Sequence, residues 1–308
     1  MKGQAMAALP VPLWAVLLSV VLLVAMLCLS ALPWLASLAG GHWPALLSPT
    51  ALHPNAVMLP PLAHTAYPLG TDDLGRSLLP RLAQGGQLSL LVGGVTAVLS
   101  VAMGLAIGLI SGYKGGWLDT VLMRGIDVLY SLPGLVVVML TLVVLQASLE
   151  AGLAHPVGAT ALAGLALPGV LPLVAMVLAL ALFSWPDTAR LVRSQTLSLM
   201  KEPYVEAALS LGIGTRRLLL KHLLPNVMAL VVLSALITLP RAILTEATLS
   251  FLGLGMAPPL SSWGTLASEG WTLLPVAGYV LWLPAGLMVT TLIALNTLGE
   301  ALKQRLLR

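Results

Sequence analysis

Charged residues are scarce in this chain of 308 residues. Asp, Glu, Lys and Arg together make up 8% of it, whereas hydrophobic residues make up 58%. A soluble protein needs more polar residues to cover its surface, so this composition excludes a soluble globular fold. Uncharged stretches of about 20 residues recur and are typical of helices that cross a bilayer. The net charge of +4 is too small to indicate binding to nucleic acid.

Cysteine is almost absent as well. Cys28 is the only one, which excludes a disulfide within the chain, and its apolar neighbours predict a buried, inert thiol. The apolar run over residues 11–32 is longer than the core of about 7–15 residues found in a cleaved signal peptide. We therefore predict an uncleaved first membrane helix, with signal cleavage as the alternative.

Motifs of catalysis are missing too. The sequence has no Gly-x-x-x-x-Gly-Lys-[Ser/Thr] phosphate loop, no Gly-x-Ser-x-Gly nucleophile turn and no His-Glu-x-x-His zinc pair. We therefore expect no ATP hydrolysis and no hydrolase chemistry on this chain, and assign no catalytic, cofactor or metal residue. His42, His53 and His64 lie in the proline-rich segment 36–86. We interpret them as surface histidines, with a metal site as the alternative.

Six apolar runs predict an all-α membrane protein. The expected helices cover residues 12–34, 88–112, 132–149, 161–183 (interrupted by Pro168, Gly169 and Pro172), 227–252 and 275–298. With these helices, 12 of the 15 Lys and Arg residues fall on one side of the membrane. Since cytoplasmic segments carry the excess of Lys and Arg, we expect both termini and the polar stretch 204–226 in the cytoplasm.

The polar stretch 204–226 is the most informative part of the sequence. It predicts two short helices, over residues 203–211 and 216–224, with Pro225 following the second. Gly212 suits a left-handed helix end, and Thr215 suits the N-cap of the second helix. Ala207, Ala208 and Gly212 together predict a ridge almost free of side chains, which a partner can approach closely.

The same stretch carries a family resemblance. Glu206-Ala207-Ala208, Gly212, and the ending His222 with Leu224-Pro225-Asn226 resemble the EAA coupling motif of bacterial ABC-importer permeases. An amphipathic helix lying at the membrane interface is the alternative. Three further segments resemble the C-type permeases of dipeptide, oligopeptide and nickel importers: residues 67–81, 113–127 and 251–264. In the first of them, Tyr67 and Ser77 depart from the family pattern, which has histidine and aspartate there.

The resemblance implies a type I ABC-importer permease fold with six membrane helices, in the bacterial cytoplasmic membrane. It implies a heterodimer with a B-type permease, two cytoplasmic ATPases that hold the ATP and Mg²⁺, and an extracytoplasmic solute-binding protein. This chain itself would hold no cofactor and would contact membrane lipid but no nucleic acid. The resemblance further implies that the ATPases are contacted by Glu206, Ala207, Ala208, Gly212, His222, Pro225 and Asn226.

The cargo expected from the resemblance is a dipeptide, an oligopeptide or a related small solute. Nickel or a metallophore is the alternative within the family. A secondary transporter that works alone is the alternative from another class, although the sequence shows no convincing internal repeat. We divide the chain into residues 1–86 (first helix and extracytoplasmic segment), 87–300 (membrane core, with the coupling helices at 201–226) and 301–308 (cytoplasmic tail).

Two helix faces carry further expectations. Gly104, Gly108 and Gly112 recur every four residues and predict close packing against another helix. A stripe of hydroxyl-bearing side chains and one arginine on helix 227–252 predicts a translocation path. Along this path, Arg241 would bind a carboxylate of the substrate or of the partner permease. In the alternative, its hydroxyls bond their own helix and Arg241 extends to the outer surface. The members of that stripe are Ser234, Thr238, Arg241, Thr245 and Thr248.

Polar residues outside these helices give three smaller expectations. Thr71 is expected to cap a short helix with Asp72 and Asp73 in its first turn. Asp119 and Arg124 are expected either to be solvated or to form a polar clamp between helices. The segment 253–264 is expected to be a loop outside the membrane.

Overall fold

The computed structural model describes residues 11–38, 48–154 and 169–306, and the structural statements below refer to these residues. They form helices and connecting loops without a strand, apart from one isolated antiparallel bridge between Thr71 and Ser77. The long helices are α1 (Leu13–Leu38), α2 (Leu78–Lys114), α4 (Gly134–Ala154), α6 (Val170–Leu199), α9 (Leu224–Leu249) and α11 (Tyr279–Leu306). The shorter ones are η2 (Pro54–Ala56), α3 (Gly116–Ser131), α7 (Pro203–Ser210), α8 (Thr215–Leu218), η4 (Leu219–Leu223), η5 (Ser250–Leu254) and α10 (Trp263–Thr272).

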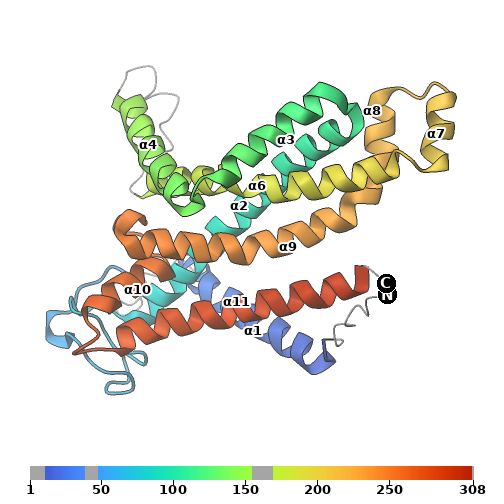
Figure 1. Cartoon of the computed structure of the whole chain (residues 1–308). Helices are drawn as coiled ribbons and strands as arrows, with labels where there is room; N and C mark the ends of the chain where they lie inside the picture. Colours follow the sequence, from blue (N-terminus) through green and yellow to red (C-terminus); the bar gives the residue numbers. More distant parts are fainter. Residues whose placement is uncertain (1–10, 39–47, 155–168, 307–308) are drawn as a thin grey trace, which may run out of the picture.

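Six helices of the described chain are long and apolar enough to cross a membrane, which confirms the predicted all-α membrane fold. The α8, η4, α9 and η5 segments join into one of them, over residues 215–254. Figure 1 shows α2, α6 and α9 running alongside one another through the middle, with α1 and α11 on one side. The helix α4 packs on α6 and leaves the bundle at a steep angle.

The two ends of the bundle differ in structure. Figure 1 shows α7 and α8 at one end, which is also where α11 finishes. Near this end the backbone N–H of Val11 donates to Gln304 Oε1 at 3.0 Å, so the beginning of the described chain is tied to α11. The opposite end holds α10 and the loop segment before α2.

Three buried apolar clusters hold these elements together. The first joins α2, α4, α6 and α9 through side chains such as Val92, Leu142 and Met176. The second, considered below, surrounds α7 and α8. The third joins α1, α2, α10 and α11, with Trp263 of α10 1% exposed at its centre. Between membrane helices, contacts of this kind stabilise the bundle through van der Waals packing, because lipid tails are as apolar as the side chains.

Several predicted boundaries were wrong. The helix α2 begins ten residues earlier than expected, so the division at residue 86 falls inside it. The helix α6 continues to Leu199 instead of ending near residue 183, because Pro186 is accommodated within it at a buried position. It begins after Gly169, whose φ of +81° is left-handed; the expected helix over residues 161–168 lies outside the described residues.

One further expectation is confirmed over most of its length, and another was wrong. In the segment predicted as a loop, residues 255–262 are not helical, and α10 begins at Trp263; Ser262 and Thr265 form a reciprocal capping box that fixes this start. Cys28 is exposed on α1, not buried. It lies on a face of α1 that the other described helices leave uncovered, because α1 packs on α2 and α11 only along one side.

Candidate functional site

The polar stretch forms a hairpin of two short helices, α7 and α8. The first ends as predicted: Gly212 has φ +72°, its N–H donates to Leu209 O at 2.9 Å, and the N–H of Ile213 donates to Ala208 O at 3.2 Å. These two bonds form the Schellman motif, which satisfies the last carbonyls of a helix. A side chain at Gly212 would be strained by the backbone, although nothing lies within 4 Å of the position of its Cβ.

The second half of the hairpin differs from the prediction. Gly214 occupies the N-cap position, and Thr215 is already helical; its hydroxyl bonds with Tyr113 OH at 2.9 Å and so ties the hairpin to the end of α2. Pro225 does not end a helix. The chain passes through the π-helical segment η4 into α9, and Pro225 lies in the first turn of α9, where a missing N–H is tolerated.

At this junction the side chain of Asn226 binds the backbone carbonyl of His222. Asn226 Nδ2 donates to His222 O at 2.6 Å and to Tyr204 OH at 3.2 Å. The first bond adds a side-chain donor to a backbone carbonyl one turn earlier, at the junction of η4 and α9. The second joins the start of α7 to the start of α9, so Asn226 closes the hairpin at its base.

One face of the hairpin is buried in the helix bundle. Val205, Ala208, Leu218 and Leu223 join side chains of α2, α6 and α9 in the second apolar cluster. Ala208 is 5% exposed, so it does not belong to the exposed ridge that the sequence predicted. The reason is the helical period: Val205 and Ala208 are three residues apart and face the same side. The hairpin is therefore packed against three membrane helices.

The other face is open. Glu206 and Ala207 are exposed on α7, and Gly212 is exposed at the turn. Beside them lies a depression of about 560 Å³ lined by Gly214, Thr215, Arg216, Arg217, Leu220 and Lys221. The exposed surface thus combines small residues, one carboxylate and three basic side chains. Such a surface suits a protein partner that approaches the backbone and offers acidic groups.

The glycines of α2 lie against α6. A Cβ built on Gly104 would lie 2.5 Å from Thr188 Cβ, and one on Gly108 would lie 2.7 Å from Ala189 O. One on Gly112 would lie 2.7 Å from Thr196 Cβ. Real Cβ atoms essentially never approach so closely, so α2 and α6 are in contact along a line on which only glycine fits.

The predicted polar stripe on α9 divides into two parts. Ser234 and Thr238 are buried, and Ser234 bonds with Thr188 of α6 at 2.5 Å. Thr238, Thr245 and Thr248 donate to the carbonyls four residues earlier in their own helix, as the alternative reading expected. Thr238 is 8% exposed, so its side chain does not reach the exposed surface of this chain.

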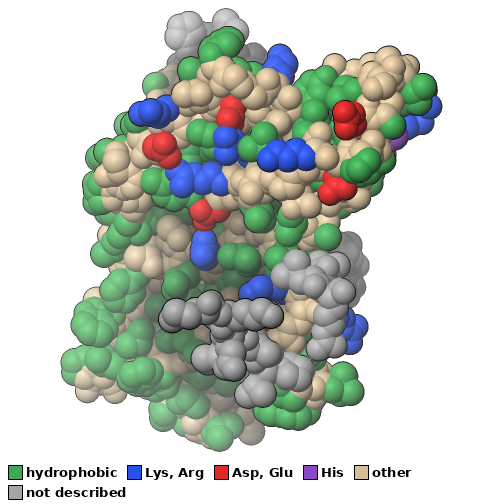
Figure 2. Space-filling view, turned by 45° about the vertical axis from the view of Figure 1, so that its right-hand side comes forward, with side chains coloured by type: hydrophobic (Ala, Val, Ile, Leu, Met, Phe, Trp, Pro, Cys, Tyr) green, Lys and Arg blue, Asp and Glu red, His purple; other side chains and the backbone are tan. Residues whose placement is uncertain are grey.

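Arg241 lies on the exposed part of the stripe and has a partner within the chain. Its Nη1 donates to Asp187 Oδ2 at 2.9 Å, and the two side chains are 68% and 58% exposed. Asp187 Oδ1 accepts from Tyr130 OH, and the Arg190 guanidinium stacks on the Tyr130 ring at 4.6 Å. Figure 2 shows acidic and basic side chains gathered on one face among hydrophobic ones.

A second contact between α3 and α6 settles the role of Asp119. Its carboxylate accepts from both Arg193 and Ser111, so it forms the clamp between helices, whereas Arg124 is exposed. The hydrogen bond from Arg193 is the main cause that lowers the pKa of Asp119 below its usual value, and it outweighs desolvation, which acts in the opposite direction.

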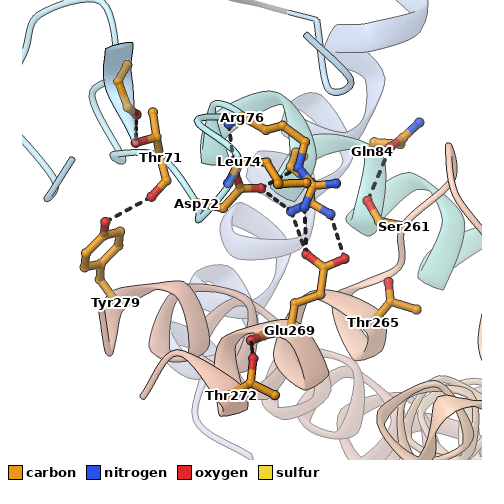
Figure 3. Close-up of polar contacts among 12 residues, drawn as sticks. Thr71, Asp72, Leu74, Arg76, Gln84, Ser261, Thr265, Glu269, Thr272 and Tyr279 are labelled. Carbon is orange, nitrogen blue, oxygen red and sulfur yellow. Dashed lines mark hydrogen bonds and ion pairs between the residues drawn. The ribbon is translucent and has the colours of Figure 1, made fainter. Parts of the chain in front are cut away.

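At the other end of the bundle, the buried side chain of Asp72 lies in a cluster of ionic residues (Figure 3). The expected short helix is absent. Instead, Asp72 Oδ1 accepts the backbone N–H groups of Leu74 and Arg76, which folds a turn. Its Oδ2 accepts from Arg76 Nε at 2.6 Å and from Arg81 Nη1 at 2.7 Å, and Arg81 reaches Glu269 of α10. The cluster joins the loop segment, α2 and α10.

Three acidic residues of these networks were not proposed as site residues from the sequence: Asp187, Glu246 and Glu269. Glu246 is fully buried in α9 and accepts from Ser89 at 3.0 Å and from Ser250 at 2.7 Å. An ionisable residue inside an apolar run is in itself a signal of function or of a specific partner. That signal was available for Glu246, and Ser250 lies one helical turn away, but its other partner, Ser89, lies 157 residues earlier in the sequence.

Comparison with known proteins identifies the family. The family described as "Binding-protein-dependent transport system inner membrane component" matches residues 104–308, which include both the glycine stripe and the hairpin. This chain belongs to that family. The permeases of the family are transport subunits, and the six apolar helices agree with a multi-pass membrane protein.

Individual relatives agree with this assignment. The oligopeptide transport system permease protein OppC of Bacillus subtilis is 38% identical over 237 residues, covering 77% of this chain and 70% of the relative. The dipeptide transport system permease protein DppC of the same organism is 37% identical over 249 residues, covering 80% and 70%. OppC of Escherichia coli K12 is 35% identical over 246 residues, covering 80% and 74%.

Proposed function

We propose that this family member is one of two permease subunits of an ATP-driven peptide importer in the bacterial cytoplasmic membrane. The observation that carries the proposal is the hairpin, which exposes Glu206, Ala207 and Gly212 on one face and is buried among α2, α6 and α9 on the other. Its proposed partners are a homologous permease, two cytoplasmic ATPases and an extracytoplasmic solute-binding protein. The names of the relatives support peptides as the cargo.

The hairpin is suited to transmit movement. Asn226 holds α7 to the start of α9, Thr215 holds α8 to α2, and the apolar cluster holds both helices to the bundle. A partner that moves the exposed face therefore moves the ends of three membrane helices together. ATP and Mg²⁺ belong to the ATPases in this proposal, and this chain contributes the docking surface and the mechanical connection.

The translocation path is proposed along the exposed face of α6 and α9 that carries Asp187 and Arg241. Arg241 lies 17 residues into α9, about 25 Å along the helix, and Asp187 lies 12 residues, about 18 Å, before the end of α6. Charges at that depth are costly against lipid and usually face water or protein. Thr245 and Thr248 lie further along the same side of α9, whereas Thr238 is buried and does not line the proposed path.

A substitution at Ala207 tests the docking surface. Ala207 is exposed on a regular helix, so Ala207→Leu strains no backbone and fills no cavity in this chain. We expect the variant permease to reach the membrane but to retain less ATPase on affinity purification and to lose peptide-stimulated ATP hydrolysis. An added side chain at a close contact costs about 1–3 kcal/mol, which is about a 5- to 150-fold loss of affinity.

The matched control is Ala207→Ser, which keeps a small side chain at the same position and should behave as wild type. Gly212→Leu should fail more severely, because it adds left-handed strain to the same steric obstruction. If Ala207→Leu retains the ATPases and the stimulated hydrolysis in full, the hairpin is not the docking surface.

A further inference from the structure

Asp187 and Arg241 form an exposed ion pair, and each side chain could bind a charged ligand if the pair separated. Arg241 donates to one oxygen of Asp187 through Nη1 alone, and it has no other polar side-chain partner among the described residues. Its remaining N–H groups are accessible, since the side chain is 68% exposed. Asp187 is 58% exposed, so both members can be reached from the same side.

The neighbouring residues keep Asp187 in place when Arg241 moves. Tyr130 OH donates to its second oxygen, and Arg190 stacks on the Tyr130 ring while pairing with Asp127 at 2.5 Å. Burial, followed by the bond to Asp187, raises the pKa of Tyr130 to about 12, so the phenol stays a donor at neutral pH. Asp187 is therefore the fixed member of the pair, and Arg241, on its long side chain, is the movable one.

The charges of this group cancel. Asp127 and Asp187 are balanced by Arg190 and Arg241, so these four side chains carry no net charge although they present separate anions and cations. A ligand with a single charge would leave one member of the pair unmatched. A ligand that carries one carboxylate and one ammonium can replace both members, and the number of charge-assisted hydrogen bonds is then unchanged.

We propose that Asp187 and Arg241 form a two-point site for the charged ends of a short zwitterionic peptide, with Arg241 binding the carboxylate and Asp187 binding the ammonium. This inference rests on the proposed function, because it places the site on the translocation path. The ligand must compete with the ion pair between Arg241 and Asp187, so its binding is weak. Weak binding suits a site that must release its ligand during transport. A longer peptide would engage the two residues in turn, one end at a time.

The test uses the complete transporter in proteoliposomes, with trialanine at a saturating concentration of the binding protein. Arg241→Gln and Asp187→Asn are each expected to lower uptake about tenfold or more, since each removes one charge-assisted contact. Both variants should co-purify with their partners in wild-type amounts, which shows that the transporter is assembled. The control is Lys303→Gln, which breaks an exposed ion pair with Glu300 on α11 and should leave uptake unchanged.

Peptides with one blocked terminus show which residue binds which end of the peptide. With a C-terminal amide, Arg241→Gln should no longer differ from wild type, and with an N-acetyl group the same should hold for Asp187→Asn. The binding protein is identical in every comparison, so the ratio of variant to wild-type uptake isolates the permease step. Uptake that is equal in variant and wild type for free trialanine would overturn the site.

A purely structural pair predicts another pattern. The double variant Asp187→Asn with Arg241→Gln contains no uncompensated charge, so it would recover uptake if the pair only held α6 to α9. We expect it to remain as impaired as the single variants, and recovery would overturn the proposal. If the wild-type complex itself shows no ATP-dependent uptake of trialanine, the proposed function fails instead, and the two failures are thereby distinguished.

Discussion

Replacing Gly108 by isoleucine tests the packing of α2 on α6. A Cβ at Gly108 would lie 2.7 Å from the carbonyl oxygen of Ala189 and 2.8 Å from Val192 Cβ. The first neighbour is backbone, so it cannot move aside without shifting α6. Extra carbons forced into a packed contact cost about 1–3 kcal/mol, and isoleucine adds four of them, so we expect the upper end of that range.

The matched control is Gly94→Ile in the same helix. Nothing lies within 4 Å of a Cβ at Gly94, so this variant carries the same change in helix propensity without the contact. The assay is thermal unfolding of the purified permease, with retention of the partner subunits as a second readout. We expect Gly108→Ile to unfold at a temperature several degrees below that of Gly94→Ile. Equal unfolding temperatures would refute the packing argument.

Three other predictions address the polar clusters. Glu246→Gln should leave thermal stability almost unchanged because the amide oxygen accepts from one buried serine and the amide nitrogen can donate to the hydroxyl oxygen of the other, whereas Glu246→Ala should cost about 2–4 kcal/mol; equal losses would contradict this. Asp119, whose pKa is lowered by Arg193, contributes stability that is complete above its unfolded value near 3.8 and is lost as pH falls through the lower folded value. Unfolding temperatures measured between pH 6 and 3 should therefore fall more for wild type than for Asp119→Asn. Asp72→Asn should lower the unfolding temperature more than Glu269→Gln, because the Asp72 side chain is 1% exposed and that of Glu269 is 38% exposed; the reverse order would show that burial does not set the cost.

Features that depend on local chemistry were predictable from the sequence. The left-handed end at Gly212 follows from glycine at the end of a short helix, and the six spans follow from the length of the apolar runs. The glycine period on α2 indicated a packing face, although it did not identify α6 as the neighbour. In each case the residues that decide the structure lie within a few turns of one another.

Features that depend on distant partners were not predictable. Thr71 and Asp72 have the composition of a helix start, but Asp72 instead accepts backbone N–H groups of the following turn and pairs with Arg81, which also binds Glu269. Arg241 was recognised as unusual, yet its partner Asp187 lies 54 residues earlier. Ala208 was placed on the exposed ridge because its burial depends on how the hairpin folds back on α2 and α6.

The measurement that tests the account most directly is peptide uptake by proteoliposomes that contain this permease, its homologous partner and the two ATPases. We predict accumulation of trialanine that requires both ATP inside the vesicles and the binding protein outside, and that is abolished by Gly212→Leu. Accumulation by this chain alone, driven by an ion gradient without the ATPases, would contradict the account and identify a secondary transporter.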